Sequence, residues 1–332
     1  MLPAVFLRAQ GARRVEVRHP MLDNPAMTLP AAVSERLATR RGRVLRERVI
    51  EFVLFLAASL SVFTTLAIVY ILVSESVTFF RQVPIIDFLT DTQWTPLFDD
   101  AHFGIMVLVS GTLVSSLVAL VIAVPMGTII AIYLSEFATP GIREFAKPLL
   151  ELLAGIPTIV YGYFALLFVT PILQWLIPSL PGFNLLSAGL VMGIMIVPTV
   201  ASLSEDAMRA VPAALREGSY AMGATRLQTA LKVVTPAAFS GIAAAYILGI
   251  SRAVGETMIL AVAAGMQPNL TWNPMEPAAT ITSYIVQVAL GDLPHGSIGY
   301  QTIFAAGLML MLITLAFNVL GHMLRRRYRE SY

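Results

Sequence analysis

Six apolar segments, each long enough to cross a lipid bilayer, account for most of this chain. About 20 helical residues span a hydrocarbon core of about 30 Å. In lipid, the backbone polar groups must bond to one another, and a helix meets this condition within a single segment. The sequence therefore predicts an all-α, polytopic membrane protein with six transmembrane helices, near residues 51–74, 105–133, 148–175, 185–201, 237–264 and 298–323.

The composition supports a membrane protein and excludes a thiolate metal site. Charged residues make up 13% of the chain and hydrophobic residues 57%, whereas soluble domains carry about 25% charged residues. Cysteine is absent, so disulfides and cysteine-bound metals are excluded. The four histidines are scattered without the spacing of metal ligands. We expect no metal, no cofactor and no nucleic-acid partner.

The basic residues predict how the chain is oriented. All 22 lysines and arginines except Arg81 and Arg252 lie before the first span, on alternate loops or in the tail. Basic residues are retained on the cytoplasmic side of a membrane, so both termini are predicted to be cytoplasmic. We expect a basic N-terminal arm over residues 1–49, a membrane domain over 50–325 and a basic tail over 326–332.

The basic arm does not have the features of a signal peptide, because it lacks an apolar core before the first span. Residues 1–32 are expected to be disordered. Residues 33–50 are predicted either as a basic helix on the membrane surface or as a solvated arm that fixes the topology.

Two ionisable residues, Arg252 and Glu256, lie inside the fifth apolar segment. An arginine at bilayer depth costs about 2.5–3.5 kcal/mol even on the lenient insertion scale, so a function is expected for it. Because the two residues are four positions apart, we predict that they share one helical face. The alternative is a buried salt bridge that only holds the helix in register.

The chemistry of this pair suits an oxyanion. A guanidinium offers a planar fork of donors that matches two phosphate oxygens. Glu256 can accept a proton from dihydrogen phosphate, which sulfate cannot give, or it can neutralise Arg252 when no anion is present. Ser251 and Thr257 add hydroxyl groups nearby. We predict that these four residues line a substrate pathway.

The most informative polar segment is the predicted cytoplasmic loop 202–236. Small and apolar residues recur at helical spacing on both sides of Gly223, which predicts two short helices joined by a glycine turn. The alternative, a solvated connector, is disfavoured because the loop carries many apolar side chains that need cover. These are Ala207, Met208, Val211, Leu215, Tyr220, Met222 and Leu227.

This loop resembles the coupling loop of ATP-binding-cassette (ABC) importer permeases. Their pattern is Glu-Ala-Ala, three residues, Gly, nine residues, then Ile-x-Leu-Pro. It is matched in spacing here by Glu217, Gly218, Ser219, Gly223 and residues 233–236, with glycine and serine replacing the alanines and threonine replacing the leucine. The resemblance implies docking onto a cytoplasmic ATPase, with Glu217 as a polar anchor, Gly223 as the turn and Pro236 closing the motif.

Four further stretches resemble the phosphate-importer permeases of the Pst type, at residues 103–138, 151–166, 216–230 and 251–261. The similarity runs from about residue 50 to 325, and the segment ESVTFF (75–80) is more similar to the first permease subunit of that system. The resemblance implies a type I ABC importer permease fold in a bacterial inner membrane. It also implies a second homologous permease, two cytoplasmic ATPase subunits and an extracytoplasmic phosphate-binding protein as partners.

The chain has no ATP-binding motif of its own. Lys147 is followed by proline and Lys232 by valine, so neither lysine closes a Gly-Lys-Ser/Thr phosphate loop. We therefore expect no enzymatic activity, with ATP hydrolysis in a partner subunit. The alternatives are a permease for another oxyanion such as phosphonate or sulfate, an ATP-independent anion channel, and a membrane-embedded hydrolase, for which no span carries a Ser–His or His–Glu constellation.

Two packing features complete the predictions. Pro157, in the third apolar segment, should kink its helix, either as a hinge for alternating access or as a fixed bend. Gly189 and Gly193 form a GxxxG pair in the fourth segment. This pair favours close helix packing over contact with a substrate.

Overall fold

The computed structural model of the chain describes residues 41–327 except 99, 292 and 295. The first helix, α2 (Arg41–Phe80), has 40 residues and is therefore about 60 Å long. Its first part, up to Leu66, forms one unit, and the residues from Ala67 onward form another. The last residues of the predicted arm are thus helical and continue into the first span. Residues 1–40 and 328–332 lie outside the described residues.

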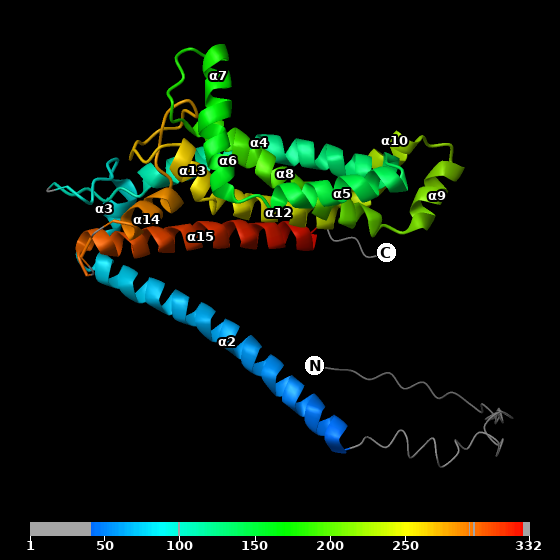
Figure 1. Cartoon of the computed structure of the whole chain (residues 1–332), viewed down its shortest axis with the longest axis horizontal. Helices are drawn as coiled ribbons and strands as arrows, with labels where there is room; N and C mark the ends of the chain where they lie inside the picture. Colours follow the sequence, from blue (N-terminus) through cyan, green and yellow to red (C-terminus); the bar gives the residue numbers. More distant parts are fainter. Residues whose placement is uncertain (1–40, 99, 292, 295, 328–332) are drawn as a thin grey trace, which may run out of the picture. The chain divides into compact units, whose positions relative to one another are not determined.

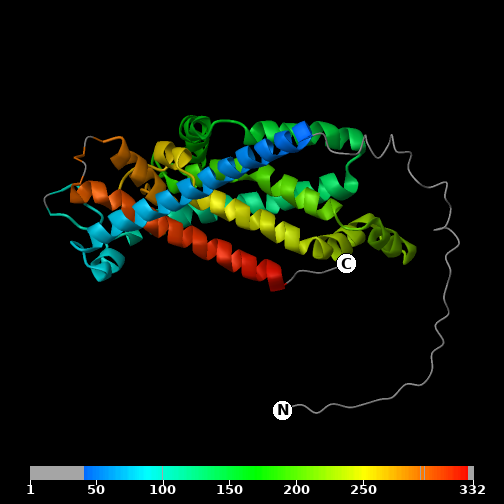
Figure 2. The same cartoon turned by 90° about the horizontal axis from the view of Figure 1, so that it is seen from below.

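Four long helices lie side by side in the second unit: α4 (Met106–Ile132), α8 (Leu185–Arg209), α12 (Phe239–Val254) and α15 (Ile298–Arg327) (Figures 1 and 2). The central one is α8, since 67% of its most apolar window is buried, against 28% for α4 and 11% for α15. The predicted close packing at the glycine pair is confirmed. A Cβ atom at Gly189 would lie 2.7 Å from the Val118 side chain, and one at Gly193 would lie 2.8 Å from the Ala119 carbonyl.

One end of this bundle is closed by aromatic packing around two short helices, α3 (Ile85–Thr90) and α14 (Ile281–Ala289). Trp94 is 2% exposed and meets Tyr284 edge-on, with ring centroids 5.1 Å apart. Phe79 and Phe88 pack beside them. This packing brings α3 and Trp94, which follow the first span, into contact with α14, which follows the fifth.

The third apolar segment is not one helix. It is divided into α5 (Pro140–Ala154), α6 (Thr158–Phe164), η3 (Ala165–Val169, a π-helical turn) and α7 (Thr170–Leu176). Pro157 is extended between α5 and α6, with ψ 134°. Figure 1 shows α6 and α7 turned across the direction of α4 and α8. The prediction of a continuous span over 148–175 is therefore wrong, because the chain breaks at Gly155–Pro157 instead of kinking.

Two π-helical turns share the sequence Ala-Leu-x-x-Val-Thr-Pro: η3 and η4 (Ala230–Val234). Proline has no N–H and cannot continue the normal bonding pattern. In each turn the threonine before the proline donates its hydroxyl to the alanine carbonyl five residues earlier, at 2.9 Å for Thr170 and 2.8 Å for Thr235. The threonine N–H reaches the same carbonyl. A local widening thus keeps the backbone bonded up to each proline.

The fifth span is bent twice. The helical run Arg226–Ala237 meets α12 at 73°; it consists of α10 (Arg226–Thr229), η4 and α11 (Thr235–Ala237). Beyond α12 a second break leads to α13 (Met258–Ala263). Five described helices are long and apolar enough to cross a membrane, and counting the bent pair as one span gives six.

The predicted loop 202–236 is shorter than expected. Its first eight residues continue α8 to Arg209, and the residues from Arg226 onward belong to the bent helical run. Only residues 210–225 lie between the two long elements, and they contain the short helix α9 (Ala213–Ala221). Residues 202–209 carry three charged side chains, so hydropathy ends the apolar run before the helix ends.

Candidate functional site

Arg252 and Glu256 are separated by a helix break. α12 ends at Val254, Gly255 follows with φ −90°, and α13 begins at Met258. The prediction that the two residues share one helical face is therefore wrong. Glycine is a poor helix former, and the carboxylate that follows it offers an acceptor for the N–H groups of a new helix.

Glu256 is held by the protein. It is 7% exposed, and its Oε1 accepts hydrogen bonds from the backbone N–H groups of Met258 at 3.1 Å and Ile259 at 3.4 Å. Its own carbonyl accepts a hydrogen bond from the Thr282 hydroxyl at 2.6 Å. No described protein group bonds to Oε2. Glu256 thus caps α13 with one carboxylate oxygen and keeps the other available.

Arg252 has few partners. Nη1 donates a hydrogen bond to Thr199 Oγ1 on α8 at 3.1 Å, and this is its one hydrogen bond to the described residues. A guanidinium has five N–H donors, so four have no protein acceptor within the described chain. Arg252 forms no ion pair with Glu256 or with any other described carboxylate. The alternative of an internal salt bridge is therefore wrong, and the half-buried cation is open to a ligand.

The two predicted hydroxyl residues do not join Arg252. The Ser251 hydroxyl donates to Asn318 Oδ1 on α15 at 3.4 Å, so it is directed to a different neighbour from Arg252. Thr257 donates to the Gly255 carbonyl within the helix break, also at 3.4 Å. Their contact with a substrate stays a prediction. Sequence reasoning missed Thr199, which lies on another helix and carries no recognisable signal.

The breaks of the third and fifth spans are linked through α6 and α13. The Tyr161 hydroxyl on α6 donates across the first break to the Leu153 carbonyl at 2.8 Å. A Cβ at Gly162 would lie 3.2 Å from the Met258 carbonyl, so α6 and α13 are closely packed. Arg252 therefore lies beside the junction of two discontinuous helices, the kind of place where transport proteins hold ions.

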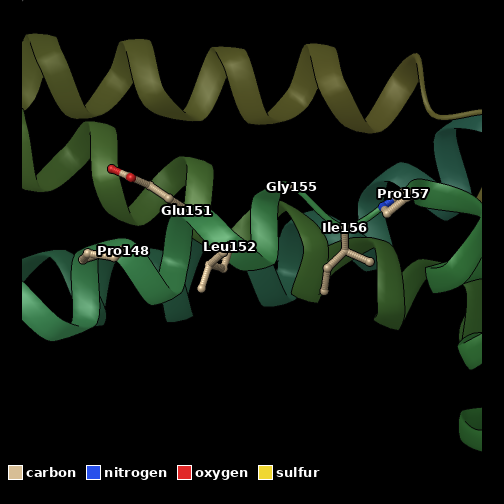
Figure 3. A pocket seen from close by; sticks show the side chains of 6 residues that line it. All are labelled: Pro148, Glu151, Leu152, Gly155, Ile156 and Pro157. Atoms are coloured by element: carbon tan, nitrogen blue, oxygen red, sulfur yellow. The ribbon is translucent and has the colours of Figure 1, made fainter.

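An open hollow of about 600 Å³ lies at the first break (Figure 3). Glu151 is the one ionisable residue in its lining, and in Figure 3 its side chain points away from the side on which Leu152 and Ile156 lie. Pro157 forms one end of the hollow. The position of Pro157 at a break is established, and its role as a hinge stays a prediction. The full lining is Pro148, Glu151, Leu152, Gly155, Ile156 and Pro157.

The predicted pair of short helices around Gly223 is confirmed. Gly223 has φ 82°, a conformation that glycine adopts without penalty. Its N–H bonds to the Tyr220 carbonyl at 2.9 Å, and the Ala224 N–H bonds to the Ser219 carbonyl at 3.2 Å, which is the Schellman pattern of a helix end. Thr225 then starts α10 with a capping box.

The apolar side chains of this region fall into two groups. Met208 and Val211 are 0% and 5% exposed and pack in a core with Ile242. Met222 and Leu227, near the turn, are 88% and 56% exposed. The chain thus covers the base of the segment itself and leaves the tip uncovered, as a docking surface requires.

The residues matched to the importer motif occupy different environments. Glu217 and Gly218 are exposed on α9. The Ser219 hydroxyl lies 2.9 Å from that of Thr229, which joins α9 to α10. Pro236 lies at the start of α11, next to the 73° bend. Docking of a partner at these residues stays a prediction.

Arg216, next to Glu217, holds the base of α9 and was not singled out from the sequence. Its guanidinium bonds both carboxylate oxygens of Glu136 at 2.9–3.3 Å, and it donates to the carbonyls of Met208 at 2.8 Å and Val211 at 2.7 Å. Glu136 lies in η2 (Tyr133–Phe137), at the end of α4, and its side chain is 4% exposed. One arginine therefore fixes α9 to the ends of both α4 and α8.

A second charged cluster joins α5 to α8. Glu205 is 1% exposed and lies 3.1 Å from Arg143 Nε and 2.9 Å from Lys147 Nζ. Lys147 also contacts Asp206. From the sequence alone, these basic residues indicate only the topology. The spacing of Arg143 and Lys147 on one helical face hinted at a shared partner, but the partner lies about 60 residues away.

Comparison with known proteins now identifies the class. Residues 123–330 match the family described as "Binding-protein-dependent transport system inner membrane component". The chain is 34% identical to the probable ABC transporter permease protein YqgH of Bacillus subtilis, over 89% of this chain and 96% of that protein. It is also 34% identical to the phosphate transport system permease protein PstC of Mesorhizobium japonicum, over 72% and 78%.

Solved structures agree on the fold. A bacterial ABC transporter that imports alginate aligns with 87% of this chain and 100% of its own, with a TM-score of 0.60 at 16% identity. The predicted type I ABC importer permease fold is confirmed. The fold is that of a multi-pass membrane component. The chain belongs to the family of binding-protein-dependent transport system inner membrane components, and is thus a permease subunit of the inner membrane.

Proposed function

We propose that this chain is a permease subunit of an ATP-driven importer of inorganic phosphate. The observation that carries the proposal is the half-buried Arg252, with one protein hydrogen bond and no ion pair among the described residues. A cation placed this way is costly in a membrane unless a ligand meets it. The phosphate-transport names of relatives such as the Mesorhizobium protein support phosphate as that ligand.

The chemistry at the site suits dihydrogen phosphate. The free N–H groups of Arg252 donate to the oxygens of the anion. The Glu256 oxygen that does not cap α13 accepts a hydrogen bond from a protonated oxygen of the anion, and sulfate has no such donor. The carboxylate cap keeps the helix break in place, so that the same residue both shapes the pathway and selects the ion.

The remaining parts follow from the importer motif and the charge distribution. Both termini face the cytoplasm, since the basic residues gather on that side. A second, homologous permease completes the pathway, and an extracytoplasmic phosphate-binding protein supplies the substrate. Two cytoplasmic ATPase subunits dock on the exposed tip around Gly223. They hydrolyse the ATP, and their closure moves α9.

Phosphate uptake by intact cells carrying Arg252→Gln tests the proposal. We expect uptake to fall to background while the complex still assembles, as checked by co-purification of the partner subunits. Arg209→Gln is the matched control, because Arg209 is 42% exposed and lies 3.6 Å from Glu205. Normal uptake by the Arg252 variant would contradict the proposal and show that this residue has only a structural role.

The same assay separates the alternative functions. Competition by sulfate or phosphonate identifies a permease for another oxyanion. Uptake that persists when the partner ATPase is inactivated identifies an ATP-independent channel. The proposal predicts that neither anion competes and that uptake stops without ATP hydrolysis.

A further inference from the structure

Thr199 differs from several threonines inside the long helices of this chain. A threonine inside a helix commonly donates its hydroxyl to the carbonyl four residues earlier. Thr112, Thr128 and Thr314 all do so, at 2.8, 2.6 and 2.9 Å. Thr199 instead accepts a hydrogen bond from Arg252, and its own proton has no acceptor within the described residues.

The environment of this hydroxyl favours an anion. It is partly exposed on α8, and its oxygen lies 3.1 Å from a guanidinium nitrogen. A hydroxyl that accepts a hydrogen bond from a cation is polarised and becomes a better donor. The neighbouring N–H groups of Arg252 and the unused O–H therefore form adjacent donors on two different helices.

We propose that Thr199 is a second anion-contacting residue, which accepts a hydrogen bond from Arg252 and donates its own proton to an oxygen of the transported oxyanion. The inference rests on the proposed function of Arg252 and adds a contact on another helix. The anion then bridges α8 and α12. Separating these two helices removes one of the two contacts and lowers the affinity of the site.

The rest of the structure provides a way to cause that separation. Arg216 fixes α9 to the end of α8 through the Met208 carbonyl. α9 reaches α12 by a different route: its Ser219 hydroxyl contacts that of Thr229 in α10, and the chain then passes through the 73° bend into α12. A displacement of α9 therefore acts on the helix of Thr199 through Arg216 and on the helix of Arg252 through the bend.

The absence of cysteine in this chain allows a direct test by labelling. Thr199→Cys in the assembled transporter is treated with a small anionic thiosulfonate, and the mass of this chain is followed. We expect labelling that millimolar inorganic phosphate slows at least about fivefold and that sulfate does not slow. Val200→Cys is the matched control, because Val200 is 0% exposed and should stay unlabelled. Failure to label Thr199→Cys in any nucleotide state, or labelling at the same rate with phosphate, would overturn the inference.

Transport by two further variants tests the hydroxyl itself. Thr199→Ser keeps the donor, and Thr199→Val removes it with little change of shape. With saturating phosphate-loaded binding protein, we expect Thr199→Ser to transport within about twofold of the parent. Thr199→Val should lose about tenfold, the size expected for one hydrogen bond to a charged group.

These variants test the anion contact of Thr199 separately from the proposed function of Arg252. Normal transport by Thr199→Val, or an equal loss in the serine variant, overturns this inference while the loss in Arg252→Gln upholds the proposed function. Full transport by Arg252→Gln overturns the proposed function and this inference with it.

Discussion

Arg216 and Arg252 carry the same side chain in two contrasting settings. Arg216 bonds two carboxylate oxygens and two backbone carbonyls, whereas Arg252 bonds one hydroxyl. An arginine whose donors are mostly met by the protein holds elements together, because a ligand would have to displace existing bonds. An arginine with unused donors is prepared for a ligand. The difference in protein partners is what distinguishes the structural role of Arg216 from the ligand-binding role that we propose for Arg252.

The largest expected effect is on stability, and it should distinguish the two arginines. Arg216→Gln leaves the carboxylate of Glu136 buried without a cation, which costs about 3–5 kcal/mol. Arg252→Gln removes one hydrogen bond and relieves a desolvated charge, so its cost should lie within about 1 kcal/mol. Thermal unfolding of the purified chain in detergent measures both.

Arg216→Lys is the control for the first variant, because it keeps the charge but loses the fork of donors. Its stability in thermal unfolding should lie between that of the parent and that of the glutamine variant. Equal destabilisation by Arg216→Gln and Arg252→Gln would show that the number of protein partners does not separate the two roles.

A smaller effect is expected at the tip of the segment that Arg216 anchors. Gly223→Asp forces a side chain into a left-handed conformation, which costs about 1–2 kcal/mol, and places a charge beside the exposed Met222. Co-purification with the partner ATPase should fall several-fold. Gly141→Ala is the control, since Gly141 lies outside the motif and no atom lies within 4 Å of an added Cβ there; it should co-purify normally. Unchanged recovery of the ATPase with Gly223→Asp would contradict docking at this turn.

The smallest expected effect is on the pH dependence of the loop between α3 and α4, where His102 pairs with Asp91. His102 Nδ1 lies 2.8 Å from Asp91 Oδ2, and this hydrogen bond raises the pKa of His102 from its ordinary value of 6.5. Burial raises the pKa of Asp91, but hydrogen bonds from Gln93 and His102 outweigh it and lower the pKa below 3.8.

The signs of these two shifts define a pH window. The histidine contribution is present below about pH 6.5 and is lost as the pH rises through the raised pKa, whereas the aspartate contribution is present above about pH 3.8 and is lost on acidification. The Thr95 amide, which bonds to the His102 carbonyl, should therefore be better protected from hydrogen exchange at pH 5.5 than at pH 8.5, with both protection factors corrected for the intrinsic rate. The difference should vanish in His102→Gln; an equal difference in that variant would assign it to another group.

Much of the fold could be predicted from the sequence, because the signals are local. Apolar length predicted most of the spans, although the third segment is divided at Gly155–Pro157. The Gly223 turn and the close packing at Gly189 and Gly193 followed from the properties of glycine. The break after α12 was missed because the apolar run continues through it. Gly255, followed by Glu256 and Thr257, is a stop and start signal for helices that hydropathy alone conceals.

The site was harder to predict, since its contacts join distant parts of the chain. Arg252 was found because a charge in an apolar run is conspicuous. Its partner Thr199 lies 53 residues away, and Arg216 and Glu136 are 80 residues apart. No spacing rule reaches that far, so Arg216 was interpreted only as a topology signal. Its role required the packing of α4, α8 and α9.

The most direct test of the account is a density map of the assembled transporter with phosphate bound. The account predicts an anion within hydrogen-bonding distance of the Arg252 guanidinium, with Arg216 still paired to Glu136. A map in which the Arg252 guanidinium forms an ion pair with a carboxylate of the second permease, while phosphate is bound elsewhere, would contradict the account.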